Sequence, residues 1–294
     1  GAQYLDGTTD VTRTVAIVPM RHNSERVPGK NYRPLAGVPL YHHVIRTLSA
    51  VPEIDLIVID TDSEFIIADC AEHFPQVQVL LRPEHLRDGA IAMNDVLLNT
   101  LDQVDADIAL QTHSTNPFLK TETVSAALKL FTEPGNDFDS VFSVTRLQAR
   151  LWDAETRPVN HDPSVLLRTQ DLAPLFIENS CFFIFTPELL RQRGNRIGAR
   201  PHMVEMEPLE AVDIDAVLAG LAAKKGGGGN YKQSIVDLLK LLDMDSSLAA
   251  RKELAGELNV HAGADGTAEQ NIALMKAVVA NLAANGGKVP DSWK

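Results

Sequence analysis

A loop rich in cations follows the first apolar stretch of the chain. The stretch reads TVAIVP over residues 14–19, and the loop reads RHNSERVPGKN over residues 21–31. Cations, small polar side chains and a Pro-Gly turn are what a triphosphate needs, because they combine positive charge with hydrogen-bond donors. We therefore predict a phosphate-binding loop, with an ordinary basic surface loop as the alternative. The candidate residues are Arg21, Ser24, Arg26, Lys30 and Asn31.

This loop is not a Walker loop. The pattern G-x-x-x-x-G-K would require a glycine at position 24, where the chain has Ser24, and Lys30 is followed by Asn31 instead of Ser or Thr.

A pair of carboxylates lies in the stretch EAVDID, residues 210–215. In an extended segment residues two apart point to the same side, so Asp213 and Asp215 would face one ligand together. Mg²⁺ is held by one or two carboxylates with phosphates and water, which makes this pair a candidate metal site. On its own the pattern also fits a solvated turn or a helix start, and Asp60 and Asp62 have the same spacing and the same ambiguity.

Alternating strands and helices must position these residues. Strands separated by helices of 10–15 residues predict an α/β fold, doubly wound and Rossmann-like, with a mainly parallel sheet. Ligands in such sheets bind beyond the carboxyl ends of the strands, which is where the loop after residue 19 lies. We expect strands at residues 14–19, 55–60, 77–81, 108–111, 140–144 and 181–185, and helices at 40–48, 63–73, 94–101 and 121–131.

Composition excludes several classes of protein. The 294 residues carry a net charge of −12, which argues against a nonspecific nucleic-acid partner. No run of about 18 apolar residues is present, so we expect no membrane span. Residues 1–13 lack the basic-then-apolar order of a secretory signal, and we expect them to be an extension whose Gly1 is typical of a cloning remnant. Cys70 and Cys181 cannot build a disulfide framework, which favours a reducing cytoplasm.

The charge and composition change near residue 216. Of 27 basic and 39 acidic side chains, residues 217–294 hold 9 and 8, so residues 1–216 hold 18 and 31. The run Gly226–Gly229 is typical of a flexible linker. We predict a body over residues 14–216, a linker over 217–230 and a small helical domain over 231–294.

Three short helices are expected in the small domain. Ile235, Leu238, Leu239 and Leu242 recur at helical spacing, and Ser246 or Ser247 would cap a second helix through Leu258. Thr267 and Gln270 form a capping box for a third helix, which Gly286 and Gly287 would end.

The stretch from Val15 to Leu48 resembles the start of the cytidylyltransferases that make CMP-activated acidic sugars. These are the acylneuraminate (sialic acid) enzymes and their ketodeoxyoctonate relatives. The resemblance rests on Arg21, Ser24, Lys30 and Asn31, with Pro-Gly before the lysine. Where the sialic acid enzymes often have Lys after the serine the chain has Glu25, whereas Arg26 fits the Ser-x-Arg arrangement of the ketodeoxyoctonate enzymes.

Further motifs extend the resemblance to Asp215. DTDS at 60–63, RPEHLRD at 82–88, ENSCFFIF at 178–185 and EAVDID at 210–215 each resemble a segment of the family. The resemblance implies that Asn31, Arg82 and Asp88 recognise the nucleotide and that Asn179 belongs to the sugar site.

One departure concerns the sugar. Where the family often reads QPTSPLR this chain reads HSTNPFL from His113, so a histidine replaces the glutamine that contacts the sugar. Gln111 lies two residues earlier and would face the same way along a strand. We assign Gln111, His113 and Asn179 to the sugar site; a structural role for His113 is the alternative, and the departure leaves sialic acid itself open as the substrate.

The resemblance implies an enzyme that transfers CMP from CTP to the anomeric hydroxyl of a nonulosonic or ulosonic acid and releases pyrophosphate. Arg21 and Lys30 would be catalytic together with Asp213 and Asp215, which would hold Mg²⁺. Residues 146–177 would be the extension through which two chains form a homodimer. The alternatives are a nucleotide or sugar sensor, or non-catalytic fusion, that retains the fold, and a nucleotidyltransferase of other specificity. The C-terminal segment resembles a small uncharacterised bacterial helical domain family.

Overall fold

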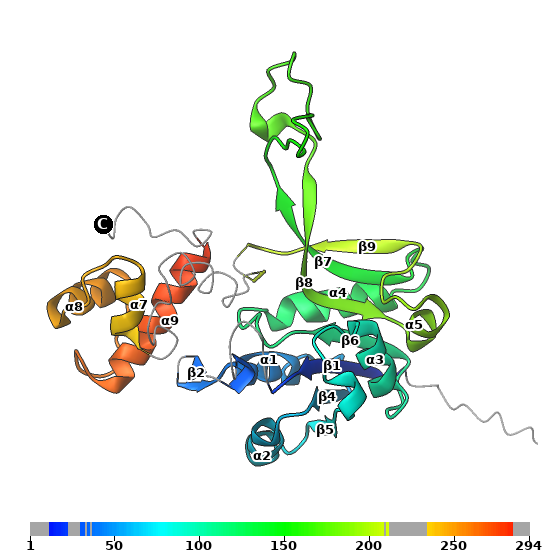
Figure 1. Cartoon of the computed structure of the whole chain (residues 1–294), viewed down its shortest axis with the longest axis horizontal. Coiled ribbons are helices and arrows are strands. Elements are labelled where there is room, and N and C mark those ends of the chain that lie inside the picture. The colour runs from blue at the N-terminus through cyan, green and yellow to red at the C-terminus, as the bar shows by residue number, and fades with distance from the viewer. Residues whose placement is uncertain are drawn as a thin grey trace, which may run out of the picture.

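The structure, a computed structural model, describes residues 12–22, 30–32, 34–35, 37–208, 210–211 and 234–284. Seven strands of this part form one sheet in the order β5-β4-β1-β6-β8-β7-β9 (Figure 1). The strands are β1 (Thr14–Met20), β4 (Leu56–Thr61), β5 (Gln78–Leu81), β6 (Ile108–Thr112), β7 (Ser140–Leu147), β8 (Leu175–Phe185) and β9 (Pro201–Glu205).

The sheet is mostly parallel, as the alternation of strands and helices predicts. β1 pairs in parallel with β4 and β6, β4 with β5, and β7 with β9. β8 is antiparallel to both of its neighbours, β6 and β7. The fold class inferred from the sequence is therefore confirmed.

Helices cover both faces of the sheet. One core contains Ala16 and Val18 of β1 with residues of α1 (Leu40–Ser49), α2 (Glu64–His73) and α4 (Thr121–Thr132). The other contains Val15 and Ile17 with residues of α3 (Met93–Leu101) and α5 (Pro187–Arg193). Successive side chains of a strand point to opposite faces of the sheet. Because helices cover both faces, β1 is buried at every position, and its sequence is therefore almost entirely apolar.

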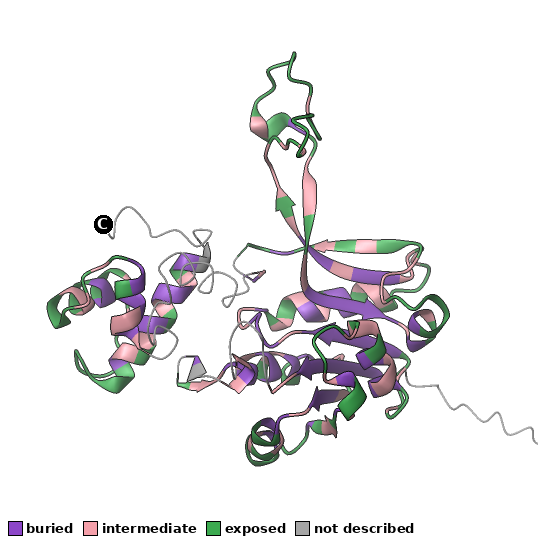
Figure 2. Cartoon of the chain, viewed as in Figure 1, coloured by how far each residue is buried: buried purple, intermediate pink, exposed green. Residues whose placement is uncertain are grey.

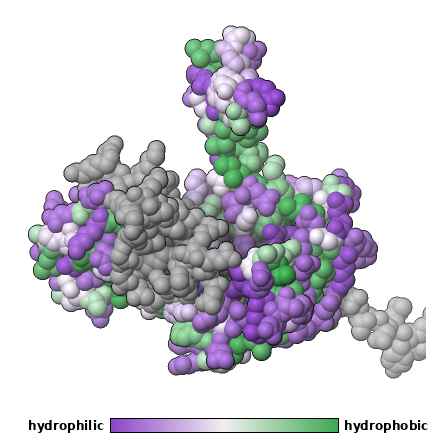
Figure 3. Space-filling model, in the orientation of Figure 1, coloured by the Kyte–Doolittle hydropathy of each residue, from purple (hydrophilic) through white to green (hydrophobic). Residues whose placement is uncertain are grey.

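The long β7–β8 hairpin leaves the sheet as an arm. Leu147 pairs with Leu175, and residues 148–174 form the distal part, which contains the short helix η3 (Thr169–Asp171) (Figure 1). Most of this part is exposed (Figure 2), including Trp152, Val159 and Leu166. Apolar residues gather along the stem of the arm in Figure 3. The arm is the segment that interrupts the expected α/β alternation.

The C-terminal segment contains α7 (Ile235–Leu241), α8 (Leu248–Glu257) and α9 (Ala268–Ala284), close to the three helices expected. Ser234 and Ser247 cap α7 and α8 through their hydroxyl groups. Thr267 accepts a hydrogen bond from the Gln270 N–H at 3.3 Å, but the Gln270 side chain bonds to Val260 O and Ala262 N. The capping box is therefore only half formed, because the amide holds the loop before α9 instead.

The small domain shares a hydrophobic core with the body. Leu35 and Leu40 are buried in one cluster with residues of all three C-terminal helices, and Phe118 packs against that cluster. Leu35 belongs to a two-residue strand, β2 (Pro34–Leu35), paired with β3 (Val38–Pro39), which lies between the cationic loop and α1. The linker and the N-terminal residues 1–11 lie outside the described residues.

None of the helices in the described ranges has both the length and the apolar character needed to cross a bilayer.

Candidate active site

A pocket lies where β1, β5 and β6 end. It is open to solvent, and its volume, solvent included, is about 490 Å³. The predicted loop, the end of β1, the segments that follow β5 and β6, and the start of α3 all contribute to its lining. The lining residues are Pro19, Met20, Arg21, Lys30, Asn31, Arg82, Met93, His113, Ser114 and Thr115.

The two described cations of the loop face this pocket without a paired acid. Arg21 follows β1 directly, and Lys30 opens the short helix η1 (Lys30–Tyr32). Across the ranges that the structure describes, no carboxylate lies within ion-pair distance of either side chain. Their charge is therefore available to a ligand.

Asn31 fixes the loop from within. Its Nδ2 donates to Arg21 O at 2.8 Å, and its Oδ1 accepts from Ser114 Oγ at 2.5 Å. The side chain is 6% exposed. The sequence suggests that Asn31 recognises the nucleotide, whereas in the structure its amide joins the end of β1 to the turn after β6.

The DTDS segment supports the loop from the other side. His22 N donates to Asp62 Oδ1 at 2.7 Å, and His22 Nδ1 lies 2.8 Å from Ser63 Oγ. Ser63 also caps α2 by accepting from Ile66 N. Asp62 thus acts as a backbone anchor for the residue that follows Arg21.

Arg82 reaches the pocket through a buried ion pair. Its Nε donates to Asp60 Oδ1, and its Nη2 donates to Asp60 O at 3.3 Å. Arg82 is 3% exposed and Asp60 is fully buried. Burial raises the pKa of the Asp60 carboxyl, and the Arg82 guanidinium acts in the opposite direction. The pair places a rigid cation at the end of β5.

Gln111 and His113 lie together, as their spacing predicts. Gln111 Nε2 is 3.2 Å from His113 Nε2, which is hydrogen-bond distance. Burial lowers the pKa of His113 to about 4, helped by the positive charges of Arg196 and Lys30. The histidine is therefore neutral at pH 7 and offers hydrogen bonds instead of charge.

Other predicted residues are placed elsewhere or are not described. Asp88 is exposed, and its carboxylate accepts from Ala90 N. The Asn179 amide is used internally, by Ser143 and Cys181 at its oxygen and by Thr145 at its nitrogen. The predicted residues Ser24, Arg26, Asp213 and Asp215 lie outside the described residues.

The segment that leads to the two aspartates leaves from the edge of the sheet that carries the pocket. Glu210 is buried and accepts from Lys120 N at 3.3 Å, at the start of α4, while its carbonyl accepts from Cys181 Sγ at 3.9 Å. Lys120 follows the same turn that provides His113 and Ser114.

Sequence reasoning missed two parts of the site. Met93, Ser114 and Thr115 line the pocket, and their position after a strand or at the start of a helix was the available signal. Arg196, whose charge acts on His113, gave no signal, because its loop lies 83 residues further along the chain.

The model of the cytidylyltransferase family matches residues 15–214. The chain belongs to this family. A second family model, a domain of unknown function (DUF3597), matches residues 187–290, which contain the C-terminal helices.

Several cytidylyltransferases are similar to the chain. N-acylneuraminate cytidylyltransferase A of Danio rerio is 29% identical over 236 residues, covering 76% of this chain and 54% of that protein. The CMP-N,N'-diacetyllegionaminic acid synthase of Legionella pneumophila is 35% identical over 141 residues, covering 45% and 59%. The chain thus spans about half the length of the curated relatives it matches.

Among solved structures, a CMP:2-keto-3-deoxy-manno-octonic acid synthetase complexed with CTP has the same fold. It superposes with a TM-score of 0.53 at 15% identity, covering 73% of this chain and 100% of that one.

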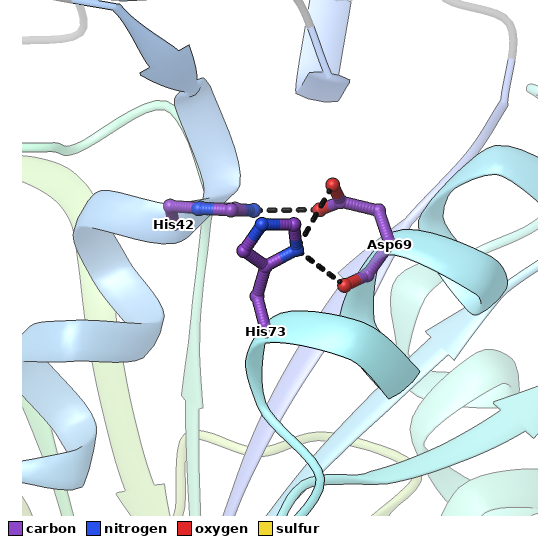
Figure 4. Close-up of side chains that lie close together, drawn as sticks. All are labelled: His42, Asp69 and His73. Atoms are coloured by element: carbon purple, nitrogen blue, oxygen red, sulfur yellow. Dashed lines mark hydrogen bonds and ion pairs between the residues drawn. The ribbon is translucent and has the colours of Figure 1, made fainter.

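A second group of titratable side chains, away from the pocket, joins α1 to α2 (Figure 4). His42 Nε2 lies 2.6 Å from Asp69 Oδ2, His73 Nδ1 lies 3.3 Å from Asp69 Oδ1, and Tyr41 OH also donates to the carboxylate. Burial acts to raise the pKa of Asp69, but the hydrogen bonds from His42 and Tyr41 hold it below its usual value. Because the carboxylate is engaged by all three, the group clamps the two helices together.

Proposed function

We propose that the chain transfers CMP from CTP to the anomeric hydroxyl of an acidic sugar, releasing pyrophosphate and giving a CMP-sugar. The observation that carries the proposal is a pocket lined by Arg21, Lys30 and Arg82 together with a neutral His113, in a chain of the cytidylyltransferase family. Two of its relatives are named for acidic sugars, an N-acylneuraminate and N,N'-diacetyllegionaminic acid, which supports the substrate class.

In this reaction the sugar oxygen forms a bond to the α-phosphorus, and the bond from that phosphorus to the bridging oxygen of pyrophosphate breaks. The hydroxyl proton is lost to solvent or to a base. Such a transfer needs mainly positioning and charge stabilisation. Arg21 and Lys30, with Ser24 and Arg26, would neutralise the charge that grows on the leaving pyrophosphate.

Arg82, Asn31 and Asp88 would serve nucleotide recognition in different ways. Arg82 is held rigid by Asp60 and can contact the nucleotide directly. Asn31 would act by shaping the loop, since its amide is bonded on both sides. Gln111 and His113 would face the sugar, with Asn179 supporting the strand behind them.

Two carboxylates two residues apart, Asp213 and Asp215, suit Mg²⁺. When bound, the metal would polarise the phosphate and help to ionise the attacking hydroxyl. Glu210, three residues before Asp213, accepts from Lys120 N at the start of α4, which favours this assignment.

We also propose a homodimer formed through the arm, residues 146–177. Leu166 is 93% exposed, and Trp152, Val159 and Val165 are each more than half exposed. Apolar side chains on a projecting hairpin favour a partner, and a second copy of the chain fits the predicted exchange of arms. The division into residues 14–216, 217–230 and 231–294 and a cytoplasmic location remain part of this proposal.

The test is pyrophosphate release with CTP, compared with ATP, GTP and UTP, over a panel of sugar acids. We expect release with CTP and at least one acid, and its abolition by Asp215→Ala with an unchanged circular dichroism spectrum. CTP binding without release would favour the sensor, and release with another nucleotide would favour a different specificity. Full turnover in the Asp215→Ala variant would overturn the metal assignment.

A further inference from the structure

The positive charge of Arg196 acts on His113, which lines the pocket. Its guanidinium carbon lies 3.8 Å from the centroid of the Phe183 ring. Phe183 is fully buried on β8 and is the register partner of Gln111 on β6. Opposed residues of an antiparallel pair share one face of a sheet, so Arg196 lies on the face that carries Gln111. Met93, which lines the pocket, packs against the same hydrophobic cluster as Phe183.

The loop that carries Arg196 is fixed at both ends. α5 ends at Gly194 in the left-handed conformation, and Gly194 O accepts from Asn94 Nδ2 at 2.8 Å. On the other side, Gly198 N donates to Ser140 Oγ at 2.8 Å and Ala199 N to Asp139 Oδ2 at 2.9 Å. The guanidinium is therefore held in position before any ligand binds.

One nitrogen of the guanidinium has no hydrogen-bond acceptor among the described residues. Nη1 of Arg196 is buried, and no hydrogen-bond partner for it occurs in the part of the chain that the structure describes. Burial lowers the pKa of Arg196 to about 10, with Glu178 acting in the opposite direction, so the group remains charged at pH 7. Arg196 is half-buried and forms no ion pair with an acid of the described ranges, and its planar fork of N–H groups matches a carboxylate.

Two hydrogen-bonding groups near Arg196 carry no charge. His113 is uncharged at pH 7, and Gln111 Oε1 is buried with no partner among the described residues. Arg196 thus adds a positive charge near two neutral hydrogen-bonding groups. Arg21 and Lys30 of the cationic loop line the pocket as well, and the charge of Lys30 also acts on His113.

We propose that Arg196 binds the carboxylate of the acidic sugar and so selects acids over neutral sugars, with Gln111 and His113 as hydrogen-bonding neighbours. The inference rests on the proposed function and extends it by naming the residue that recognises the carboxylate of the sugar.

The test compares Arg196→Met with Arg193→Met, an exposed arginine at the end of α5. Methionine keeps the apolar contact with Phe183 and removes the charge. Pyrophosphate release is measured with CTP and N-acetylneuraminic acid, N,N'-diacetyllegionaminic acid or 2-keto-3-deoxy-manno-octonic acid, each also as its methyl ester. For the best acid, Arg196→Met should lower kcat/KM about 10- to 150-fold, the loss expected when a hydrogen-bonded charged group is removed.

The other readouts separate binding of the acid from a structural role. The KM for CTP should change less than twofold in Arg196→Met, the preference for acid over ester should collapse, and Arg196→Lys should recover part of it. Arg193→Met should resemble the wild type. An unchanged preference in Arg196→Met, or an equal loss for CTP and sugar, would overturn the inference while leaving the proposed function intact. A wild type that releases no pyrophosphate with any of the acids would overturn the proposed function and the inference with it.

Discussion

Arg82 and Asp60 form an ion pair that is almost completely withdrawn from solvent, 22 residues apart in the chain. Thr100 Oγ1 lies 3.3 Å from the other carboxylate oxygen of Asp60. The pair connects the ends of β4 and β5 and gives the pocket a cation of fixed direction. Both the pocket and the packing of β4 against β5 therefore depend on this ion pair.

Replacing Asp60 by Asn should destabilise the protein by about 3–5 kcal/mol, because Arg82 would keep a buried charge without its partner. Urea unfolding at pH 7 measures this. The control is Asp102→Asn, which breaks the exposed pair with Arg191 and should cost at most about 1 kcal/mol. A similar loss of unfolding free energy in the two variants would contradict a buried ion pair between Arg82 and Asp60.

His113 should make the protein sensitive to acid. Its pKa is about 4 in the folded chain and near 6.5 when unfolded, so between these values the unfolded state binds more protons. Stability should therefore rise from pH 4 to pH 6.5 and then stay level, with His113 contributing about 3 kcal/mol of the rise. Urea unfolding of the wild type and His113→Gln at pH 4.5, 5.5 and 7 measures the effect.

Glutamine cannot take up the proton, so the rise should be smaller in His113→Gln. The matched control is His85→Gln, since His85 is exposed on the short helix η2 (Glu84–Leu86). A slope in His113→Gln as steep as in the wild type would assign the effect to other groups.

The sequence predicts the central strands of the sheet well, because a strand that is buried on both faces has a recognisable run of apolar residues. β1 and β6 are buried at every position, and such strands read as continuous apolar runs. β9 left no such trace, because its residues alternate between exposed and half-buried at the edge of the sheet. α5 has only seven residues and depends on Thr186 and Gly194 at its ends.

The site was predictable where one segment carries it, and less so where it depends on distant partners. Arg21 and Lys30 come from one loop, and Gln111 and His113 from one strand end. The bond from Ser114 to Asn31 spans 83 residues, and only the folded chain shows that it occupies the asparagine. The role of Arg196 could not be predicted from the sequence for the same reason. It depends on the stacking of its guanidinium on Phe183 and on the action of its charge on His113.

The helical domain should depend on the body for its core. Leu40 opens α1, yet it is 6% exposed and belongs to the cluster of the C-terminal helices. Leu40→Ala should cost about 2–5 kcal/mol and increase hydrogen exchange in α7 and α9. Hydrogen exchange read by mass spectrometry measures this, with the half-exposed Leu248→Ala in α8 as the control. Unchanged exchange in α7 and α9 would mean that the domain folds independently of Leu40.

The arm should decide the oligomeric state. Leu166 is 93% exposed at the distal part of the arm, where a charge would oppose burial against a second chain. Sedimentation should give twice the mass of a single chain for the wild type and a single-chain mass for Leu166→Asp. Gln170→Asp is the matched control, because it introduces the same charge at another exposed position of the arm and should remain a dimer. Since Leu166 and Gln170 are exposed and belong to none of the hydrophobic clusters of their own chain, the thermal unfolding of the body should be the same in both variants. A dimer that persists in Leu166→Asp would exclude the distal arm from the interface, and a wild type of single-chain mass would exclude the homodimer.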